Sequence, residues 1–451
     1  MLRTNEGVKM KLHVQNKQLV DENNQLFFYT ADTAWEIFHK LSFDEAKFFI
    51  DNRAQKGFNV IQAVAVAELD GLKTPTVETN EVPFSNLDTL EVNDSYFEYV
   101  KKVIAYANSK GVVIALVPMW GSYFVVNQDW GGKVAPIFDA TKAYKFLKYL
   151  SAKLKDLDII WMLGGDRPYL TDDAKAVIEN MAKAIREEVG HEQLITAHSQ
   201  GGRSVYDMLK PCDYLDFISW QSGHMGQCYP SWRNTKTDYQ RLNLPVLDAE
   251  PCYESHPIMN EYFWSRKDGI SRFTDYHVRR SSYWSVFSGG CGITYGCYGI
   301  WQMRNLKDEQ MEIPESAASA YKNDTIPYWY DSVNFPGAFQ IGYLRKFIES
   351  LPNNTKLVPK DDLIISDNPT GDGHMAAMTN ENHDFIAVYV PKSQQLCVDL
   401  EIFKGQSFSI YLYDPRYNIK NLLSTGVSET KFLNMTIPEG NLDYVLLLVK
   451  N

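Results

Sequence analysis

The chain has 451 residues, of which 45% are hydrophobic and 22% are charged. This length is sufficient for two globular domains, and the composition is not that of a disordered or fibrous protein. The 45 basic and 56 acidic side chains give a formal net charge of -11. Because this charge repels nucleic-acid phosphates and anionic lipid surfaces, we expect neither nucleic acid nor a membrane as a partner.

The content of aromatic residues is high, with 10 Trp, 27 Tyr and 23 Phe. A large core explains most of them, and a surplus is typical of clefts whose rings stack on sugars or peptides. The six cysteines show no CxxC spacing, which argues against a disulfide framework. Residues 1–11 contain no apolar stretch of a secretion signal, and no segment approaches the roughly 20 apolar residues of a membrane span. We therefore expect a cytoplasmic protein, unless a leader for secretion or for the periplasm has been removed.

The first predicted element is a hairpin at the start of the chain. The segments Leu12–Gln15 and Leu26–Tyr29 have the apolar or alternating pattern of strands, and they flank the turn-forming sequence Asp21-Glu22-Asn23-Asn24. We expect this hairpin to close the floor of a barrel.

From there, short apolar runs alternate with amphipathic stretches, the pattern of parallel strands linked by helices. Eight runs are predicted as strands, at residues 27–33, 59–66, 112–119, 159–163, 194–198, 217–221, 245–249 and 293–298. Helix start and stop signals, such as Ser42 before the first long helix and Gly57 after it, help to predict helices at residues 42–56, 94–110, 141–155, 171–189, 274–287 and 336–351. Eight strands in this alternation predict an α/β fold, a (β/α)8 TIM barrel over residues 1–351.

After Leu351 the pattern changes to short β-rich runs separated by Asn, Asp, Gly and Pro. The predicted strands are residues 385–390, 396–400, 408–413 and 444–449. They indicate an antiparallel β-sandwich over residues 352–451. Since no low-complexity linker precedes it, we expect this module to pack directly on the barrel.

In a (β/α)8 barrel the active site is assembled at the carboxyl ends of the strands. Polar and aromatic residues at the predicted strand exits are therefore candidate substrate contacts. In chain order these are Asp32, Trp35, Gln62, Trp120, Arg167, His198, Gln200, Gln221, His224, Tyr295, Trp301 and Gln302.

The exit of the fourth strand has the clearest signal, because an apolar run leads directly into Gly164, Gly165 and Asp166. Two glycines allow a ligand to approach the backbone closely, although Gly-Gly-Asp is equally consistent with a plain turn. At the seventh exit, Asp248 and Glu250 stand where a buried strand ends. When the seventh exit is considered alone, a salt bridge to Arg279 or Arg280 explains its two carboxylates equally well.

The two exits together indicate glycoside hydrolysis, because the fourth and seventh strands face each other across a barrel mouth. In a retaining glycosidase two carboxyl groups ~5–5.5 Å apart flank the glycosidic bond. Asp166 is then the general acid and base, with a raised pKa, and Glu250 is the ionised nucleophile.

Two other classes of protein remain possible interpretations. A metal-dependent barrel hydrolase would use His198, His224, Asp32 and Glu250 as ligands, but such enzymes usually take paired histidines from the first strand, where Ala31-Asp32-Thr33 stands here. A carbohydrate-binding barrel without catalysis is disfavoured by the presence of both carboxylates. Since no Gly-x-Ser-x-Gly, phosphate-binding or dinucleotide motif occurs in a strand-to-helix context, we expect no cofactor and no metal.

Six segments resemble glycoside hydrolase family 140 and follow in order along the barrel. They are residues 30–36 (TADTAWE), 57–62 (GFNVIQ), 161–167 (WMLGGDR), 221–224 (QSGH), 247–254 (LDAEPCYE) and 295–302 (YGCYGIWQ). The tail, with residues 412–416 (LYDPR) and 443–448 (DYVLLL), resembles the module that is named a collagen-binding domain in such proteins.

The resemblance implies release of apiose-linked side chains from rhamnogalacturonan II, a pectin, with Asp166 and Glu250 as the catalytic residues. The carbohydrate substrate, a plant cell-wall polysaccharide or oligosaccharide, is thus an expectation from the resemblance and not from spacing. We expect the C-terminal module to buttress the barrel, because an anionic protein without an exposed repeat gives no reason to bind collagen.

Overall fold

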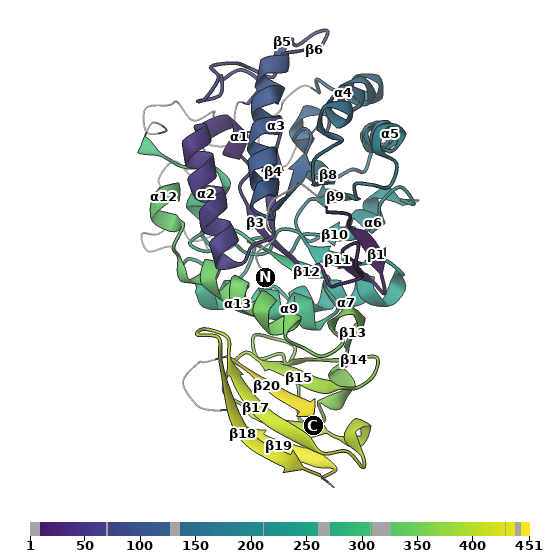
Figure 1. Ribbon diagram of the computed structural model, residues 1–451, viewed down its shortest axis with the longest axis vertical. Helices are drawn as coiled ribbons and strands as arrows, with labels where there is room; N and C mark the ends of the chain where they lie inside the picture. Colours follow the sequence, from purple (N-terminus) through teal and green to yellow (C-terminus); the bar gives the residue numbers. More distant parts are fainter. Residues whose placement is uncertain are drawn as a thin grey trace.

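The computed structural model describes residues 10–68, 71–126, 136–210, 212–259, 271–306, 308, 326–428, 430–437 and 443–451. Figure 1 shows a larger body of strands surrounded by helices and, below it, a smaller body of strands that contains the C-terminus. None of the described helices is long and apolar enough to cross a membrane.

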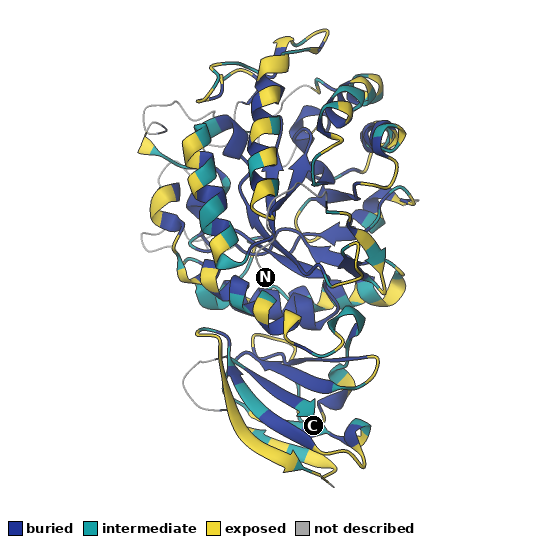
Figure 2. Cartoon of the chain, viewed as in Figure 1, coloured by how far each residue is buried: buried dark blue, intermediate teal, exposed yellow. Residues whose placement is uncertain are grey.

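Eight parallel strands lie at the centre of the larger body. Six form one sheet in the order β12-β3-β4-β7-β8-β9, and β10 pairs with β11. All eight are buried along their whole length (Figure 2), as expected for strands covered by helices. Their bounds are β3 Tyr29–Thr33, β4 Val60–Val64, β7 Val113–Val117, β8 Ile159–Arg167, β9 Ile195–Ser199, β10 Ile218–Trp220, β11 Val246–Asp248 and β12 Gly292–Tyr295.

Backbone hydrogen bonds join the two-stranded sheet to both edges of the larger one. On one side the Asp216 N–H donates to the Ile195 carbonyl at 2.8 Å. On the other side the Cys291 N–H donates to the Val246 carbonyl at 2.8 Å, and Val246 forms a parallel bridge with Gly290. The sheet thus curls into the (β/α)-barrel arrangement that the sequence alternation predicts.

The long helices surround these strands (Figure 1). They are α2 Phe43–Lys56, α3 Asp94–Ser109, α4 Ala140–Leu154, α5 Asp172–Val189, α7 Ser231–Arg241, α9 Asp275–Phe287 and α13 Pro336–Glu349; the short helices are α1 Ile37–Lys40, α6 Val205–Leu209, α10 Tyr298–Trp301 and α12 Trp329–Ser332. The predicted capping of α2 is confirmed, because Ser42 and Glu45 form a capping box and Gly57 ends the helix with φ 96°. Sequence analysis missed α7, since the residues that it buries are Ser231, Thr235 and Asp238, which leave no apolar periodicity to detect.

The predicted N-terminal hairpin is wrong in its second strand. β1 (His13–Gln15) pairs with β2 (Gln18–Val20) through a two-residue turn in which Asn16 and Lys17 have φ values of 50° and 59°. Such a turn matches the twist of a hairpin, so it closes the pair before the predicted turn at residues 21–24 is reached. The predicted partner segment contributes a single bridge, from Leu26 to Val20. A second small hairpin, β5 (Phe84–Asn86) and β6 (Glu91–Val92), precedes α3.

The C-terminal body contains a six-stranded antiparallel sheet in the order β13-β14-β15-β20-β17-β18 and a two-stranded sheet of β16 and β19. The four strands predicted there are confirmed as β15, β16, β17 and β20, and the other four were missed. The bounds are β13 Leu357–Pro359, β14 Ala376–Asn380, β15 Phe385–Val390, β16 Gln395–Asp399, β17 Phe408–Asp414, β18 Ile419–Val427, β19 Phe432–Thr436 and β20 Tyr444–Lys450.

The two faces of the six-stranded sheet pack in different directions. Ile386 and Leu446 belong to a core that also contains Leu396 from the small sheet, which is consistent with a β-sandwich. Their strand neighbours Ala387 and Leu447 join the core of the barrel instead. The module therefore packs directly on the barrel, as expected, because alternate residues of each strand serve the two cores.

Candidate active site

The carboxyl end of β8 is bent by a β-bulge. Gly164 pairs with His198 and the next pair is Arg167 with Ser199, which leaves Gly165 and Asp166 without a partner in the ladder. The strand was predicted to end at Leu163, but it continues through this bulge to Arg167. Bulges re-aim side chains near active sites, and here the bulge turns Asp166, with φ 42°, away from the regular alternation.

Both glycines of the bulge are required by close contacts. A Cβ atom on Gly164, whose φ is 86°, would lie 2.0 Å from the Tyr169 hydroxyl oxygen. On Gly165 a Cβ atom would lie 2.6 Å from the indole ring of Trp120. The Tyr169 hydroxyl accepts a hydrogen bond from the Gly165 N–H at 2.6 Å. The Gly-Gly pair therefore lets Tyr169 and Trp120 press against the backbone that presents Asp166.

This contact predicts a large difference between two Gly→Ala variants. Gly164→Ala should lower the free energy of unfolding by roughly 2–5 kcal/mol, because a left-handed alanine costs about 1–2 kcal/mol and the displacement of Tyr169 costs about 1–3 kcal/mol. Gly111→Ala is the matched control, since Gly111 has φ 74° but nothing lies within 4 Å of its Cβ position. Urea denaturation of both variants measures the difference. Equal losses would contradict a role for the Tyr169 contact.

Asp166 lies in a nearly closed environment. Its side chain is 9% exposed, its backbone N–H donates to His198 Nδ1 at 3.1 Å, and its carboxyl group is hydrogen-bonded by Gln221. Burial, and then the negative charge of Glu250, raise the pKa of Asp166 well above its usual value. The surroundings of Asp166 therefore favour its protonated form more than those of an exposed aspartate do.

Glu250 follows β11 and lies between two imidazoles. His224 Nε2 is 3.1 Å from its Oε1, and His198 Nε2 is 3.1 Å from its Oε2, at an angle less direct than a full hydrogen bond. On the far side of each ring, Nδ1 accepts a backbone N–H, from Asp166 in His198 and from Tyr253 in His224. An accepting Nδ1 places the proton of a neutral imidazole on Nε2, so both rings direct an N–H group at the Glu250 carboxylate.

These contacts shift the pKa of Glu250 in the opposite direction from that of Asp166. Burial opposes ionisation of Glu250, but the N–H groups of His198 and His224 outweigh it and lower the pKa of the carboxyl group below its usual value. The surroundings thus favour the protonated form of one carboxyl group and the ionised form of the other, the combination that paired acid and nucleophile carboxylates require.

Aromatic side chains and one arginine complete the surroundings. The Trp35 ring is 5.3 Å from the ring of Trp120 and 5.3 Å from that of His198, edge-on in both cases. Arg167 donates to the Asp166 carbonyl at 2.8 Å and to Glu68 Oε1 at 3.0 Å. Arg167 is almost fully buried, and these hydrogen bonds stabilise the bulge.

Sequence analysis did not single out Tyr253 or Glu68. The Tyr253 hydroxyl interacts with Glu250 and Thr33, and burial, followed by the charge of Glu250, raises its pKa well above the usual value. Its place in the segment 247–254 was a usable signal for Tyr253, whereas Glu68 had none because its role depends on the position of Arg167.

Asp32, Gln62 and Tyr295 were predicted as substrate contacts, but in the structure they contact other residues of the barrel. All three are completely buried. Asp32 forms an ion pair with Arg53 of α2, Gln62 donates to the Ala249 carbonyl at 3.0 Å, and Tyr295 donates to Glu254 at 2.6 Å. These contacts tie elements of the barrel together, and none of the three side chains exposes surface to a ligand.

Three further candidates lie at the strand exits without a described contact to Asp166 or Glu250. Gln200 and Trp301 are half-buried. Gln302 is nearly buried and donates to the Tyr298 carbonyl at 3.0 Å. These three residues follow strand exits, as the sequence indicates, and their role in substrate binding stays a prediction.

The alternative interpretations of the carboxylates find no support in the contacts. Arg279 pairs with Asp443 and Asp275, and Arg280 donates to the Gln227 carbonyl, so no described salt bridge joins either arginine to Asp248 or Glu250. Within the described ranges, no three His, Cys, Asp or Glu side chains form a group that could hold a metal ion. Asp248 accepts the Ser222 N–H at 3.1 Å, and burial raises its pKa to about 7.

Comparison with known proteins agrees with this architecture. Among solved structures, one described as a glycoside hydrolase has a TM-score of 0.82 at 24% identity, covering 97% of this chain and 96% of that one. A glycoside hydrolase family 5 protein from Bacteroides vulgatus also has a TM-score of 0.82 at 24% identity, covering 97% and 93%. At this identity the likeness shows the fold. No curated protein matches the chain.

Two family models match the chain in sequence. Residues 358–449 match the family described as a collagen-binding domain of a collagenase. Residues 13–355 match the family described as the apiosidase-like catalytic domain. This second match covers the whole barrel, including Asp166 and Glu250. The protein therefore belongs to the apiosidase-like family and is a glycosidase.

Proposed function

We propose that the protein is a retaining glycoside hydrolase in which Glu250 is the nucleophile and Asp166 the general acid and base. The observation that carries this proposal is the opposite displacement of the two pKa values: the surroundings lower the pKa of Glu250, which favours its ionised form, and raise that of Asp166, which favours its protonated form. Two neighbouring carboxyl groups in these states can act on the two sides of one glycosidic bond.

The reaction then has two steps. In the first, the Glu250 carboxylate attacks C1 of the sugar while the bond from C1 to the leaving oxygen breaks and Asp166 gives that oxygen its proton. In the second, water attacks C1, its proton passes to the Asp166 carboxylate, and the bond from C1 to Glu250 breaks.

The electrostatics of the pair suit this change of role. The charge of Glu250 is one cause of the raised pKa of Asp166. In the glycosyl-enzyme Glu250 is an uncharged ester, so this cause disappears and the pKa of Asp166 falls. Asp166 is therefore an acid when a proton must be given and a base when a proton must be removed.

For the substrate we propose a plant cell-wall polysaccharide or oligosaccharide, with apiose-linked side chains of rhamnogalacturonan II as the specific candidate within glycoside hydrolase family 140. Membership of the apiosidase-like family supports this choice. Trp35 and Trp120, whose rings lie beside His198, and Gln221, which hydrogen-bonds to Asp166, are the proposed sugar contacts. His198 and His224 are proposed to orient Glu250. We place the boundary between the catalytic barrel and the C-terminal module after Leu351.

The stereochemistry of the product tests the mechanism. With oligosaccharides released from pectin as substrates, we expect the wild type to liberate a sugar whose first-formed anomer has the configuration of the bond that was cleaved. Proton NMR recorded within the first minutes of the reaction measures this, before mutarotation mixes the anomers. Oligosaccharides from xylan and mannan are the substrate controls. An inverted first product would contradict the nucleophilic role of Glu250, and preferential cleavage of the controls would contradict the proposed substrate.

A further inference from the structure

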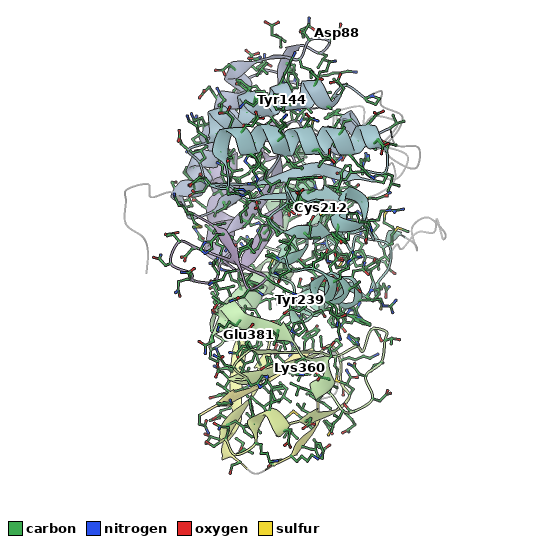
Figure 3. All side chains as sticks on the ribbon, turned by 90° about the vertical axis from the view of Figure 1, so that its right-hand side faces the viewer. Asp88, Tyr144, Cys212, Tyr239, Lys360 and Glu381 are labelled. Carbon is green, nitrogen blue, oxygen red and sulfur yellow. The ribbon has the colours of Figure 1, made fainter. Side chains whose placement is uncertain are left out.

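The C-terminal module holds helix α9 at both of its ends. The Tyr276 hydroxyl donates to the Pro391 carbonyl at 2.9 Å, and two turns further on the Trp284 Nε1–H donates to the His374 carbonyl at 2.7 Å. Figure 1 shows α9 at the end of the barrel that faces the module. In Figure 3, Tyr239 of the adjacent helix α7 lies just above Lys360 and Glu381 of the module, which shows how closely the two bodies meet.

A buried ion pair lies between these two hydrogen bonds. Arg279 Nε and Nη2 donate to the two carboxylate oxygens of Asp443 at 2.8 and 2.6 Å. Tyr389 of β15 also donates to Asp443, at 3.1 Å, and its ring stacks on Tyr283 at 4.7 Å. Because both charges are buried and paired in a bidentate geometry, the position of α9 relative to the module is narrowly defined.

The neighbouring residue, Arg280, contacts two aromatic side chains of α9 and the loop that carries His224. Its guanidinium lies over the rings of Tyr276 and Trp284, at 5.1 and 4.9 Å from their centroids. These are the two side chains that the module holds through its backbone carbonyls. Their rings fix the guanidinium by cation–π contact, and Arg280 Nη2 donates to the Gln227 carbonyl and lies 3.6 Å from Cys228 Sγ.

Gln227 belongs to the loop that carries His224. In this loop the Gly223 N–H donates to the Glu250 carbonyl at 2.9 Å, and His224 Nε2 meets the Glu250 carboxylate at 3.1 Å. Between the loop and α9 lies a small cavity, lined among others by Ser222, Gln227 and Arg280. Packing between the loop and α9 is therefore incomplete at this point, and the hydrogen bond from Arg280 to the Gln227 carbonyl connects the two directly.

We propose that Arg280 is a positioning residue for catalysis and that the C-terminal module takes part in the chemistry by holding Arg280, the loop of residues 221–230 and, through this loop, His224 against Glu250. This inference rests on the proposed function of Glu250. It gives the module a role in every catalytic cycle, different from binding a separate ligand.

The acidic limb of the pH profile reports on this arrangement. The titratable groups that interact with Glu250 are His198, His224, His256, Asp166, Asp248 and Tyr253, and the ring of His256 stacks on that of His224 at 4.2 Å. Of these, His198 and His224 are the hydrogen-bond donors that favour the ionised form of Glu250. If His224 moves away, Glu250 loses one of its N–H donors and its pKa rises, so activity should be lost at a higher pH as the solution is acidified.

The test compares Arg280→Met with Arg280→Lys and with Lys236→Met. Lys236 forms another charged contact from the barrel to the module, 2.8 Å from Asp361, and is the matched control. We expect Arg280→Met to lower kcat about 10-fold and to move the acidic limb of kcat/KM upward by roughly 1 pH unit, the scale of losing one hydrogen bond to a carboxylate. Arg280→Lys should recover part of both effects, and Lys236→Met should leave the limb in place.

A double-mutant cycle identifies the route of the effect. Because Arg280 acts through His224 in this proposal, Arg280→Met should change kcat less than about 2-fold when it is added to His224→Gln. Full additivity, or an unchanged acidic limb in Arg280→Met, would overturn the proposal and leave Arg280 with a structural role only. Trp284→Phe, which keeps an aromatic ring next to Arg280 but loses the indole N–H that bonds to His374, is a milder second variant and should move the limb in the same direction.

A readout without turnover separates this inference from the proposed function. NMR of the histidine rings, with His224→Gln to assign the signal, should show a shifted or broadened His224 signal in Arg280→Met and an unchanged one in Lys236→Met. If the wild type hydrolyses no glycoside, the proposed function fails while this measurement still decides the positioning. An unchanged His224 signal in a folded Arg280→Met protein overturns the positioning role.

Discussion

Glu250→Gln is expected to reduce kcat by roughly 10⁴-fold or more, the scale seen when a residue of a covalent mechanism is removed. The amide is close in shape to the carboxylate and its oxygen still accepts from one of the two histidines, but its NH2 group cannot accept from the other and the group can no longer bond to C1. Steady-state turnover of an aryl glycoside of the same sugar measures the loss. KM should change much less than kcat, because the substitution removes bond formation and leaves the sugar contacts in place.

Glu254→Gln is the matched control for this loss. Glu254 is a second buried carboxylate, four residues along, whose Oε2 accepts from Tyr295 at 2.6 Å and from the Gly337 N–H at 3.0 Å. An amide oxygen accepts both bonds, so kcat should stay within about 3-fold of the wild type. In Glu250→Gly, added azide should restore turnover and give a glycosyl azide of inverted configuration. Wild-type activity in Glu250→Gln would end the assignment of the nucleophile.

Asp166→Asn has the second large expected effect, and its size should depend on the leaving group. For a natural oligosaccharide, whose leaving oxygen needs a proton, kcat/KM should fall about 10²–10⁴-fold, the usual contribution of general acid catalysis. For an aryl glycoside with a good leaving group the first step should be almost unaffected, and the glycosyl-enzyme should accumulate. Azide should then accelerate turnover and give a glycosyl azide of retained configuration, opposite to the product from Glu250→Gly.

The pH profile of Asp166→Asn gives an independent check. The folded protein raises the pKa of Asp166, so the protonated and active form exists below this pKa and is lost as the pH rises through it. The wild type should therefore show an alkaline limb that is absent from Asp166→Asn. Asp248→Asn is the critical comparison, since burial raises the pKa of Asp248 to about 7. An alkaline limb that disappears in Asp248→Asn and persists in Asp166→Asn would contradict the acid assignment.

Local sequence patterns were sufficient for the order and type of most elements. The capping box of Ser42 and Glu45 and the left-handed Gly57 act within one turn of α2, so they can be read without knowing the fold. The eight buried strands are apolar on both faces because helices and the barrel interior cover them, and this leaves continuous runs in the sequence. Helix α7 was missed for the opposite reason, since it buries small polar residues.

The sequence by itself also determined which two carboxylates are candidates, because Asp166 and Glu250 each follow an apolar run at a strand exit. Only the tertiary structure decided between exit residues that look alike. Asp32 forms an ion pair with Arg53 on α2, whereas Asp166, which lies in a bulge, is close enough to Glu250 for its charge to raise the pKa of Asp166. Neighbouring positions on a strand point to opposite faces, so a bulge or a shift by one residue reverses the direction of a side chain without leaving a signal in composition. The protonation states likewise come from the tertiary structure, since burial and the imidazoles of His198 and His224 reach Glu250 from distant parts of the chain.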